Sequence, residues 1–295
     1  MIKYGDYVLL TDTTCDLPAQ VAEEYGFDAM PMVFLMNEKV YHHYLDAREM
    51  KLDDFYARLR AGELAQTTQI SYQDYFDYFE PYLDKGKDIL YICFTSGLSG
   101  TYNTCKIAIR ELKQRYPDRT IRIIDSSCAS VGQGLLVYLA AKMFKEEQPA
   151  LEELERFVED TKTECCHWFV VDDIDQLKRG GRISSLTATF AKALQIKPVL
   201  SVDNDGKLVN VGKIRGANNV YDMFIKKLQR DGRNLGEQTV IIGHASNFDG
   251  AEELKKKVKP FVKDVKISEI GPVIGTHVGT GMLALAFLGE RKFEM

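Results

Sequence analysis

Short apolar runs of strand length alternate with segments of helical periodicity through the first half of this sequence. The runs Tyr7 to Leu10, Ile89 to Phe94 and Ile121 to Ile124 have the length and apolar character of buried strands. The segments Thr101 to Arg115 and Gly134 to Phe144 carry apolar residues at helical spacing. Because parallel strands need long crossover connections, this alternation predicts a parallel sheet covered by helices.

The stretch between the first two long strands has a pattern of its own. It begins with a second apolar run, Ala29 to Met36, and continues with two segments of helical character, Leu52 to Arg60 and Tyr72 to Leu83. The polar residues Gln66 to Gln69 separate these two segments, and we expect them to form a loop.

The pattern changes after Glu164, which indicates a second domain. Pro198 to Val202 and Leu208 to Val211 flank the turn sequence Asp203-Asn204-Asp205-Gly206, which predicts an antiparallel hairpin. Further helices and strands are expected over residues 220–228, 240–243, 251–258 and 265–270, before a glycine-rich end. We therefore predict one domain of residues 1–160 and a second of residues 161–295. The boundary is set only by this change of pattern, and the segment near residues 50–85 can pack with the second domain.

Composition narrows the class of protein. The formal net charge of −5 argues against a broad basic face for nucleic acid, and no stretch approaches the roughly 20 apolar residues of a membrane span. With no signal-peptide pattern at the start, we expect a cytoplasmic protein. The six cysteines lack paired C-x-x-C spacing, and Cys165-Cys166-His167 runs directly into the apolar residues 168–171, so we expect a buried strand there and no metal site.

Small hydroxyl-bearing residues follow three of the expected strands: Thr11 to Thr14, Thr95 to Gly97 and Asp125 to Ser127. In open parallel sheets, ligands bind at the carboxyl ends of the strands, where helix N-termini attract anions. A simple helix-capping role is the alternative, and we favour it for Asp125 and Asp16. At Ser96 to Gly100, two glycines between hydroxyls favour close approach of the backbone to an anion.

The sequence contains none of the common nucleotide or hydrolase motifs. There is no G-x-x-x-x-G-K-[ST] loop, His-Glu-x-x-His pair or G-x-S-x-G elbow, so we expect the chain not to bind ATP itself. Among five histidines, His277 is distinctive because it lies in Gly271 to Gly279, a segment we expect to be too flexible and tight for ordinary core packing. It is a candidate donor to a carboxylate, with a structural role as the alternative.

Together these segments resemble the DegV family over almost the whole chain. The resemblance implies a two-domain α/β fold, with a parallel-sheet N-terminal domain, a C-terminal domain with a mixed or antiparallel sheet, and a fatty acid between them. It further implies the lipid-binding subunit of bacterial fatty acid kinase, whose separate ATP-binding kinase subunit phosphorylates the bound carboxylate to an acyl phosphate for phospholipid synthesis. The matching segments are Thr11 to Leu17, Thr67 to Gln69, Phe94 to Thr101, Asp125-Ser126, Asp172 to Ser184, Ile196 to Pro198 and Gly271 to Gly281.

The resemblance also implies site residues. The carboxylate contacts would be Ser96 with the backbone at Gly97, a threonine of the pair Thr67-Thr68, and His277. Secondary candidates in the same regions are Thr13, Ser126 and Thr280. The sequence departs from the usual family pattern at Thr68-Gln69-Ile70, where the family often has Ser-Gln-Pro, and this leaves open which threonine faces the ligand. It also departs at Thr280, where proline commonly follows the glycine, and this adds a hydroxyl near the head group. No cofactor is implied beyond the fatty acid.

Basic residues at two places have two interpretations. Lys178, Arg179 and Arg182, together with Lys213 and Arg215, are either solvated charges or a surface that docks an acidic partner or a lipid head group, with transient membrane contact. Two rival functions also stay open at this point. One is a self-sufficient small hydrolase or transferase that uses Ser96 and His277, and the other is a lipid-responsive regulatory sensor.

Overall fold

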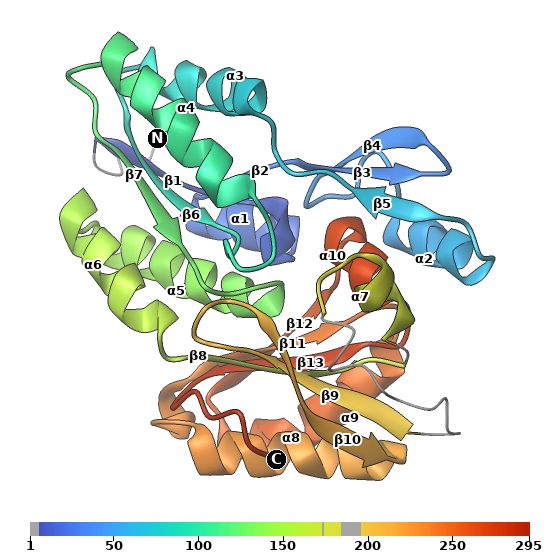
Figure 1. Ribbon diagram of the computed structural model, residues 1–295. Coiled ribbons are helices and arrows are strands. Elements are labelled where there is room, and N and C mark those ends of the chain that lie inside the picture. The colour runs from blue at the N-terminus through green and yellow to red at the C-terminus, as the bar shows by residue number, and fades with distance from the viewer. Residues whose placement is uncertain (1–5, 173, 184–195) are drawn as a thin grey trace.

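The computed structural model describes residues 6–172, 174–183 and 196–295, so Ser184, the last residue of the family-like segment Asp172 to Ser184, lies outside the described residues. The first half contains the predicted parallel sheet (Figure 1). Its strands pair in the order β2-β1-β6-β7, and all pairs are parallel. Their bounds, which confirm the three strands expected from the sequence, are β1 Tyr7–Asp12, β2 Asp28–Met30, β6 Asp88–Cys93 and β7 Ile121–Asp125.

Helices cover both faces of this sheet. Helices α3 (Tyr72–Leu83) and α4 (Thr101–Arg115) lie on one face, while α1 (Ala19–Tyr25), α5 (Val131–Glu147) and α6 (Leu151–Lys162) lie on the other (Figure 1). Helix α5 also contacts strands of the second sheet. Its residues 131–138 are all buried, as expected for a helix enclosed on every side. The first turn of α5 therefore lies where the two halves of the molecule meet.

The second half is built on a six-stranded mixed sheet with the order β10-β9-β8-β13-β11-β12. Only the β11–β12 pair is parallel, and α8 (Ala217–Asp231) and α9 (Phe248–Val258) cover the outer face (Figure 1). The predicted hairpin is confirmed by β9 and β10, and the buried strand at Cys165 by β8. The bounds are β8 Cys165–Val170, β9 Ile196–Val202, β10 Leu208–Arg215, β11 Thr239–His244, β12 Asp264–Glu269 and β13 Leu283–Leu288. The glycine-rich end thus contains an inner strand of the sheet.

A three-stranded antiparallel sheet projects beside this stack, in the order β4-β3-β5 (Figure 1). Its strands are β3 Met32–Met36, β4 Lys39–His43 and β5 Ala65–Thr67, and α2 (Leu52–Arg60) follows β4. The expectation of a loop at Gln66 to Gln69 was therefore wrong at its first two residues, because Gln66 pairs with Leu35 and Thr67 with Phe34 of β3. Tertiary pairing with the apolar β3 overrides the polar local composition.

Two short helices pack between the small sheet and the six-stranded sheet: α7 (Asp175–Arg179) and α10 (Pro272–Val278). The expectation that Gly271 to Gly279 is too flexible for core packing was wrong. Proline at the first helical position starts α10, and five of its seven residues are buried. The Tyr56 hydroxyl of α2 donates to the carbonyl of Ile270 (2.7 Å), which joins the small sheet to the second half of the chain.

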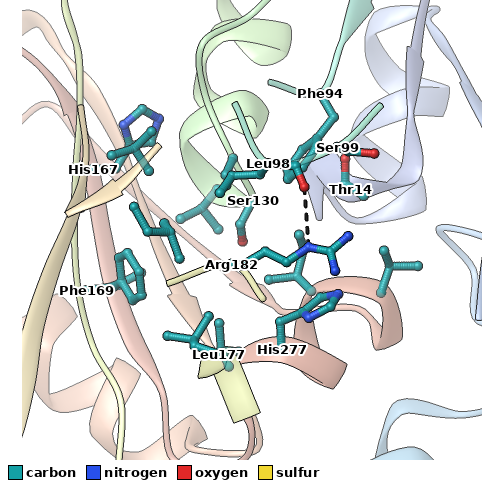
Figure 2. A pocket seen from close by; sticks show the side chains of 18 of the residues that line it. Thr14, Phe94, Leu98, Ser99, Ser130, His167, Phe169, Leu177, Arg182 and His277 are labelled. Carbon is teal, nitrogen blue, oxygen red and sulfur yellow. Dashed lines mark hydrogen bonds between the residues drawn. The ribbon is translucent and has the colours of Figure 1, made fainter. Parts of the chain in front are cut away.

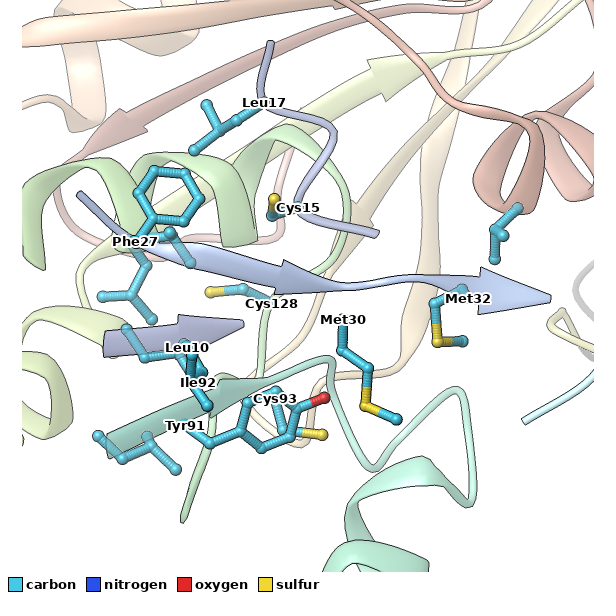
Figure 3. Packing of buried hydrophobic residues seen from close by; sticks show 14 of the residues in the cluster. Leu10, Cys15, Leu17, Phe27, Met30, Met32, Tyr91, Ile92, Cys93 and Cys128 are labelled. Carbon is cyan, nitrogen blue, oxygen red and sulfur yellow. The ribbon is translucent and has the colours of Figure 1, made fainter. Parts of the chain in front are cut away.

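The hydrophobic core of the first half is continuous from the parallel sheet to the small sheet (Figure 3). Met30 ends β2 and Met32 begins β3, and both side chains are buried. All six cysteines are free and buried, and no group of three metal-binding side chains occurs in the part of the chain that was searched. Among the described helices, none is long and apolar enough to cross a membrane. The predicted boundary at residue 160 falls in the last turn of α6.

Candidate functional site

A cavity lies between the two halves of the molecule, and both contribute to its wall (Figure 2). The first half supplies the residues after β1 and β6, the first turn of α5 and the end of β5. The second half supplies β8, the β9–β10 hairpin, α7, α10 and β13. Apolar side chains dominate, and polar groups are few. The apolar wall includes Met32, Phe94, Leu98, Ala129, Val131, Phe169, Leu177, Val202, Leu208, Val273, Ile274, Val278, Met282 and Ala284.

One end of the cavity carries a hydrogen-bonded pair of polar side chains. The Nε2 atom of His277, on α10, lies 2.8 Å from the Oγ1 atom of Thr67, at the end of β5. Both residues line the cavity, as does Thr68. Either tautomer of the imidazole leaves one donor for a ligand: the Thr67 hydroxyl proton when Nε2 carries the proton, or Nδ1–H when Nε2 accepts from the threonine.

The imidazole of His277 is neutral near pH 7. Burial, followed by the nearby positive charge of Arg182, lowers its pKa to about 4. Its Nδ1 atom has no hydrogen-bond partner among the described residues. The ring packs so closely on Gly180 that a Cβ atom at residue 180 would lie 2.4 Å from Nδ1. Glycine is therefore needed at residue 180 for the ring to occupy this place.

Arg182 brings a positive charge into the same end of the cavity. Its side chain points between Leu98 and His277 (Figure 2), and its Nε atom donates to the carbonyl of Leu98 (3.3 Å). The guanidinium also donates to the carbonyl of Gly180. A guanidinium has five N–H donors in a planar fork that matches a carboxylate, so two backbone acceptors leave donors for a ligand. From the sequence, Arg182 had two interpretations, a solvated charge or a docking residue, and neither placed it in the cavity wall, where the structure has it.

A second hollow opens from the outside onto the same three residues. This groove lies between the small sheet and α7, and it shares Thr67, Arg182 and His277 with the cavity. Its remaining wall is more polar than the cavity and includes Gln66, Gln176 and the exposed Arg179. Among the described residues, the groove is also lined by Leu59, Gly62, Glu63, Leu64, Ala65, Gly180 and Thr276. The polar end of the cavity therefore forms the junction between an apolar interior and a polar surface groove.

The turn after β6 lies beside the cavity but contributes residues other than those expected. Ser96 is exposed, and neither Ser96 nor Gly97 lines the cavity, whereas Leu98 and Ser99 do. The backbone N–H of Ser96 donates to the carboxylate of Asp125 (3.1 Å). The hydroxyl of Ser99 lies 2.8 Å from that of Thr101, at the start of α4.

The glycines of this turn serve contacts within the protein. A Cβ atom at Gly97 would lie 2.6 Å from the carbonyl oxygens of Asp205 and Gly206 in the β9–β10 hairpin. The Thr95 hydroxyl donates to the Gly206 carbonyl (3.1 Å) and accepts from the Gly97 N–H (3.1 Å). Gly206 itself has a positive φ of 72°. The close backbone approach inferred from the sequence is therefore made to the hairpin, where it joins the two halves of the molecule.

The secondary candidates Thr13, Ser126 and Thr280 do not line the cavity. The Thr13 hydroxyl accepts from the N–H of Met32 (3.0 Å), and the Ser126 hydroxyl donates to the carbonyl of Cys128 (3.1 Å). Thr280 is half-buried and, like these two, is not part of the cavity wall. Thr14, from the predicted Thr11 to Thr14 turn, and Ser130, which was not predicted, do line the cavity. Chain position marks the correct turns but does not say which hydroxyl faces inward.

A buried carboxylate holds the first half of the chain against α10. Asp16 has a positive φ of 51°, and its side chain accepts from the Gly271 N–H (2.9 Å) and the Ser130 hydroxyl (2.7 Å). Burial raises the pKa of Asp16 to about 8, although these two hydrogen bonds lower it. Gly271 immediately precedes α10, so this contact fixes the start of the helix that carries His277.

The basic residues occupy two separate places. Lys178 and Arg179 are on α7 beside the groove, and the Nζ atom of Lys178 lies 3.9 Å from Oδ1 of Asp175. Lys213 and Arg215 are exposed on β10. There they line another hollow, against α8. Their proposed docking role stays a prediction.

This architecture defines a two-domain α/β protein whose mainly apolar cavity lies between its sheets and ends in cationic and neutral hydrogen-bond donors. The chain belongs to the DegV family, whose model, described as an uncharacterised protein family, matches residues 7–290.

Known proteins with this fold extend the comparison. A DegV domain-containing protein of Clostridium perfringens is 39% identical over 288 residues, which cover 97% of this chain and 98% of that protein. A Thermotoga maritima structure described as revealing a fatty acid binding function has a TM-score of 0.83 at 28% identity and covers 96% of this chain and 99% of its own. The Streptococcus pneumoniae Fatty Acid Kinase B3 protein loaded with linoleic acid has a TM-score of 0.82 at 21% identity, with 96% and 99% covered.

Proposed function

We propose that this protein binds a long-chain fatty acid in the cavity and presents its carboxylate to a separate ATP-dependent kinase subunit. The kinase would phosphorylate the carboxylate to an acyl phosphate that feeds phospholipid synthesis. The observation that carries the proposal is the junction at Thr67, Arg182 and His277, which belongs both to the apolar cavity and to the outer groove. A ligand with an apolar tail and an anionic end matches that arrangement.

The tail and the carboxylate have different roles in this proposal. Burying about 15 methylenes at about 0.8 kcal/mol each offers on the order of 10 kcal/mol before the costs of association. A buried carboxylate without partners would cancel much of this gain. Arg182 supplies a charge-assisted hydrogen bond, and the Thr67–His277 pair supplies a neutral donor. We propose these three as the main carboxylate contacts, with Thr68 and Ser99 at their edge.

The groove gives the phosphoryl donor access to the carboxylate. In the transfer, a carboxylate oxygen attacks the terminal phosphorus of ATP, the bond from that phosphorus to the bridging oxygen breaks, and ADP leaves. The chain would contribute position and electrostatic stabilisation, while the kinase subunit holds the nucleotide and its metal. The similarity to the fatty-acid-binding Thermotoga maritima protein supports the fatty acid, and that to the Streptococcus pneumoniae Fatty Acid Kinase B3 protein supports the kinase.

The geometry does not favour a self-sufficient hydrolase built from Ser96 and His277. Ser96 is exposed outside the cavity wall, and the hydrogen-bond partner of His277 Nε2 is Thr67. A serine nucleophile needs its base within hydrogen-bond reach. The structure provides that contact to a threonine at the end of a strand instead.

Two measurements test the proposal in sequence. Mass spectrometry of a denaturing extract of the purified protein should release long-chain fatty acid, and added fatty acid should raise the melting temperature. Incubation of the loaded protein with ATP and a purified bacterial fatty acid kinase subunit should then give acyl phosphate, trapped with hydroxylamine. Absence of both released fatty acid and a thermal shift would reject the binding role. Binding without phosphorylation would reject only the kinase role.

A further inference from the structure

His167 is a buried polar residue of the cavity wall. It lines the cavity from β8, on the side opposite His277 (Figure 2), and its side chain is only 5% exposed. Neither ring nitrogen has a hydrogen-bond partner among the described residues. Every neutral imidazole has one N–H donor and one acceptor nitrogen, so this ring leaves both functions unused.

The position of the ring is built into the fold. Residues 165, 167 and 169 alternate with 166, 168 and 170 along β8, and the first set faces the core that contains α5. Gly132, in the first turn of α5, packs against the imidazole, and a Cβ atom there would lie 1.4 Å from Cδ2 and 1.8 Å from Nε2 of His167. Any side chain at residue 132 would displace the ring from this place.

The surroundings offer the ring little compensation. The wall near it is formed by apolar residues of β8, the β9–β10 hairpin and the start of α5, including Phe169, Val202 and Val131. The Cys128 thiol is close to the imidazole, but sulfur bonds weakly and this thiol is directed to the Lys162 carbonyl (4.0 Å). A buried polar group without a partner has lost its hydrogen bonds to water without replacement, which destabilises the folded protein.

We propose that His167 is a subsite for an oxygen function on the acyl chain, so that the ligand class includes hydroxy or oxo fatty acids. The inference rests on the proposed binding of a fatty acid in this cavity. A hydroxyl group can donate to one ring nitrogen or accept from the other, and a keto oxygen can accept from the N–H. A plain alkyl chain can form neither hydrogen bond, so the buried imidazole stays without a partner when such a chain is bound.

The test compares octadecanoic acid with a series of octadecanoic acids that carry one hydroxyl at different carbons. Affinities are measured by calorimetry for the full-length protein and for His167→Leu. For at least one position of the hydroxyl, His167→Leu should lower the affinity about tenfold more than it lowers the affinity for octadecanoic acid. This difference corresponds to one neutral hydrogen bond. The position with the largest loss gives the depth of the ring along the chain.

Two further variants keep the outcome decisive. Phe169→Leu changes an apolar cavity residue on the same face of β8, so it should alter the affinity for all members of the series equally. His167→Gln, which retains a donor and an acceptor, should keep part of the preference and replaces His167→Leu if that variant does not fold. If octadecanoic acid binds but no hydroxylated acid depends on His167, the inference is overturned. If no acid binds, it is the proposed function that fails.

Discussion

The cavity buries two imidazole rings, His277 at its polar end and His167 in its wall, and the two rings differ in their hydrogen-bond partners. His277 has Thr67 at 2.8 Å and the charge of Arg182 nearby, and it faces a groove that reaches the surface. His167 has no hydrogen-bond partner on either nitrogen among the residues that the structure describes, and it lies between the Cys128 thiol and a mainly apolar cavity wall. The Thr67–His277 pair can bind an anion at a fixed position. The His167 ring, which has no partner, favours a ligand that carries a hydrogen-bonding group at its level in the cavity.

The difference follows from where each ring lies in the fold. His277 comes from a short helix packed against a polar strand end, so hydroxyl and guanidinium groups can reach it. His167 comes from an inner strand of a six-stranded sheet, where its neighbours on the same face are apolar. We therefore expect variants at the His277 end to change how strongly the anionic group is held, and variants at His167 to change which tails are preferred.

The largest effect should come from the charge at the His277 end. Arg182→Gln removes a charge-assisted hydrogen bond worth about 1.5–3 kcal/mol, so the affinity for a long-chain fatty acid should fall roughly 10- to 100-fold. The affinity for the corresponding fatty alcohol, which carries no charge, should change little. Competition with a fluorescent fatty acid measures both ligands.

Arg179→Gln is the matched control for this experiment. Arg179 is exposed and lines the groove but not the cavity, so its removal should leave the affinity for free fatty acid within about twofold. Equal losses in the two variants would mean that Arg182 acts only through the general positive potential of the groove. That result would reject a direct contact between Arg182 and the bound carboxylate.

A smaller effect should distinguish the two neighbouring threonines. Thr67→Val keeps the shape of the side chain but removes the partner of His277 Nε2, and we expect a loss of about five- to tenfold in fatty acid affinity. Thr68→Val removes an exposed hydroxyl for which no bond to His277 is seen, and the loss should be about twofold or less. Calorimetric titrations of both variants decide the order, and a larger loss at Thr68 would assign the ligand contact to that residue.

The fold could be predicted from the sequence to a large extent because its main signals are local. Apolar runs and helical spacing identify the strands and helices of the parallel sheet, and the Asp203 to Gly206 turn identifies the hairpin. The strand β5 was missed because its three residues are held by pairing with β3 rather than by their own composition. Helix α10 was missed for a related reason, since its Gly275 is buried against Phe55 and Tyr56 of α2.

The candidate site could be predicted only in part. The pair at Thr67 and His277 was expected from the family resemblance, and the structure brings these residues together. The inward direction of Arg182 depends on a backbone acceptor at Leu98, which is 84 residues away in the chain. The glycine at residue 97 indicated a close approach, but only the folded chain reveals that the approaching atoms belong to the hairpin. No pattern in the sequence marked His167 as a cavity residue.

The smallest expected effect concerns pH, and it tests whether His277 is neutral. Burial and Arg182 lower its pKa to about 4, so in the free protein the imidazole carries no proton charge between pH 6.5 and 8. A carboxylate favours the charged ring, so the bound protein takes up a proton at a higher pH than the free one, and affinity should rise only as the pH falls toward the pKa of the complex. Calorimetry in buffers of different ionisation enthalpy should therefore find nearly constant affinity and little proton uptake between pH 6.5 and 8. A tenfold fall in affinity for each unit by which the pH rises across this range would mean that the pKa of the bound imidazole lies above 8, and that binding depends on a charged histidine at this end of the cavity.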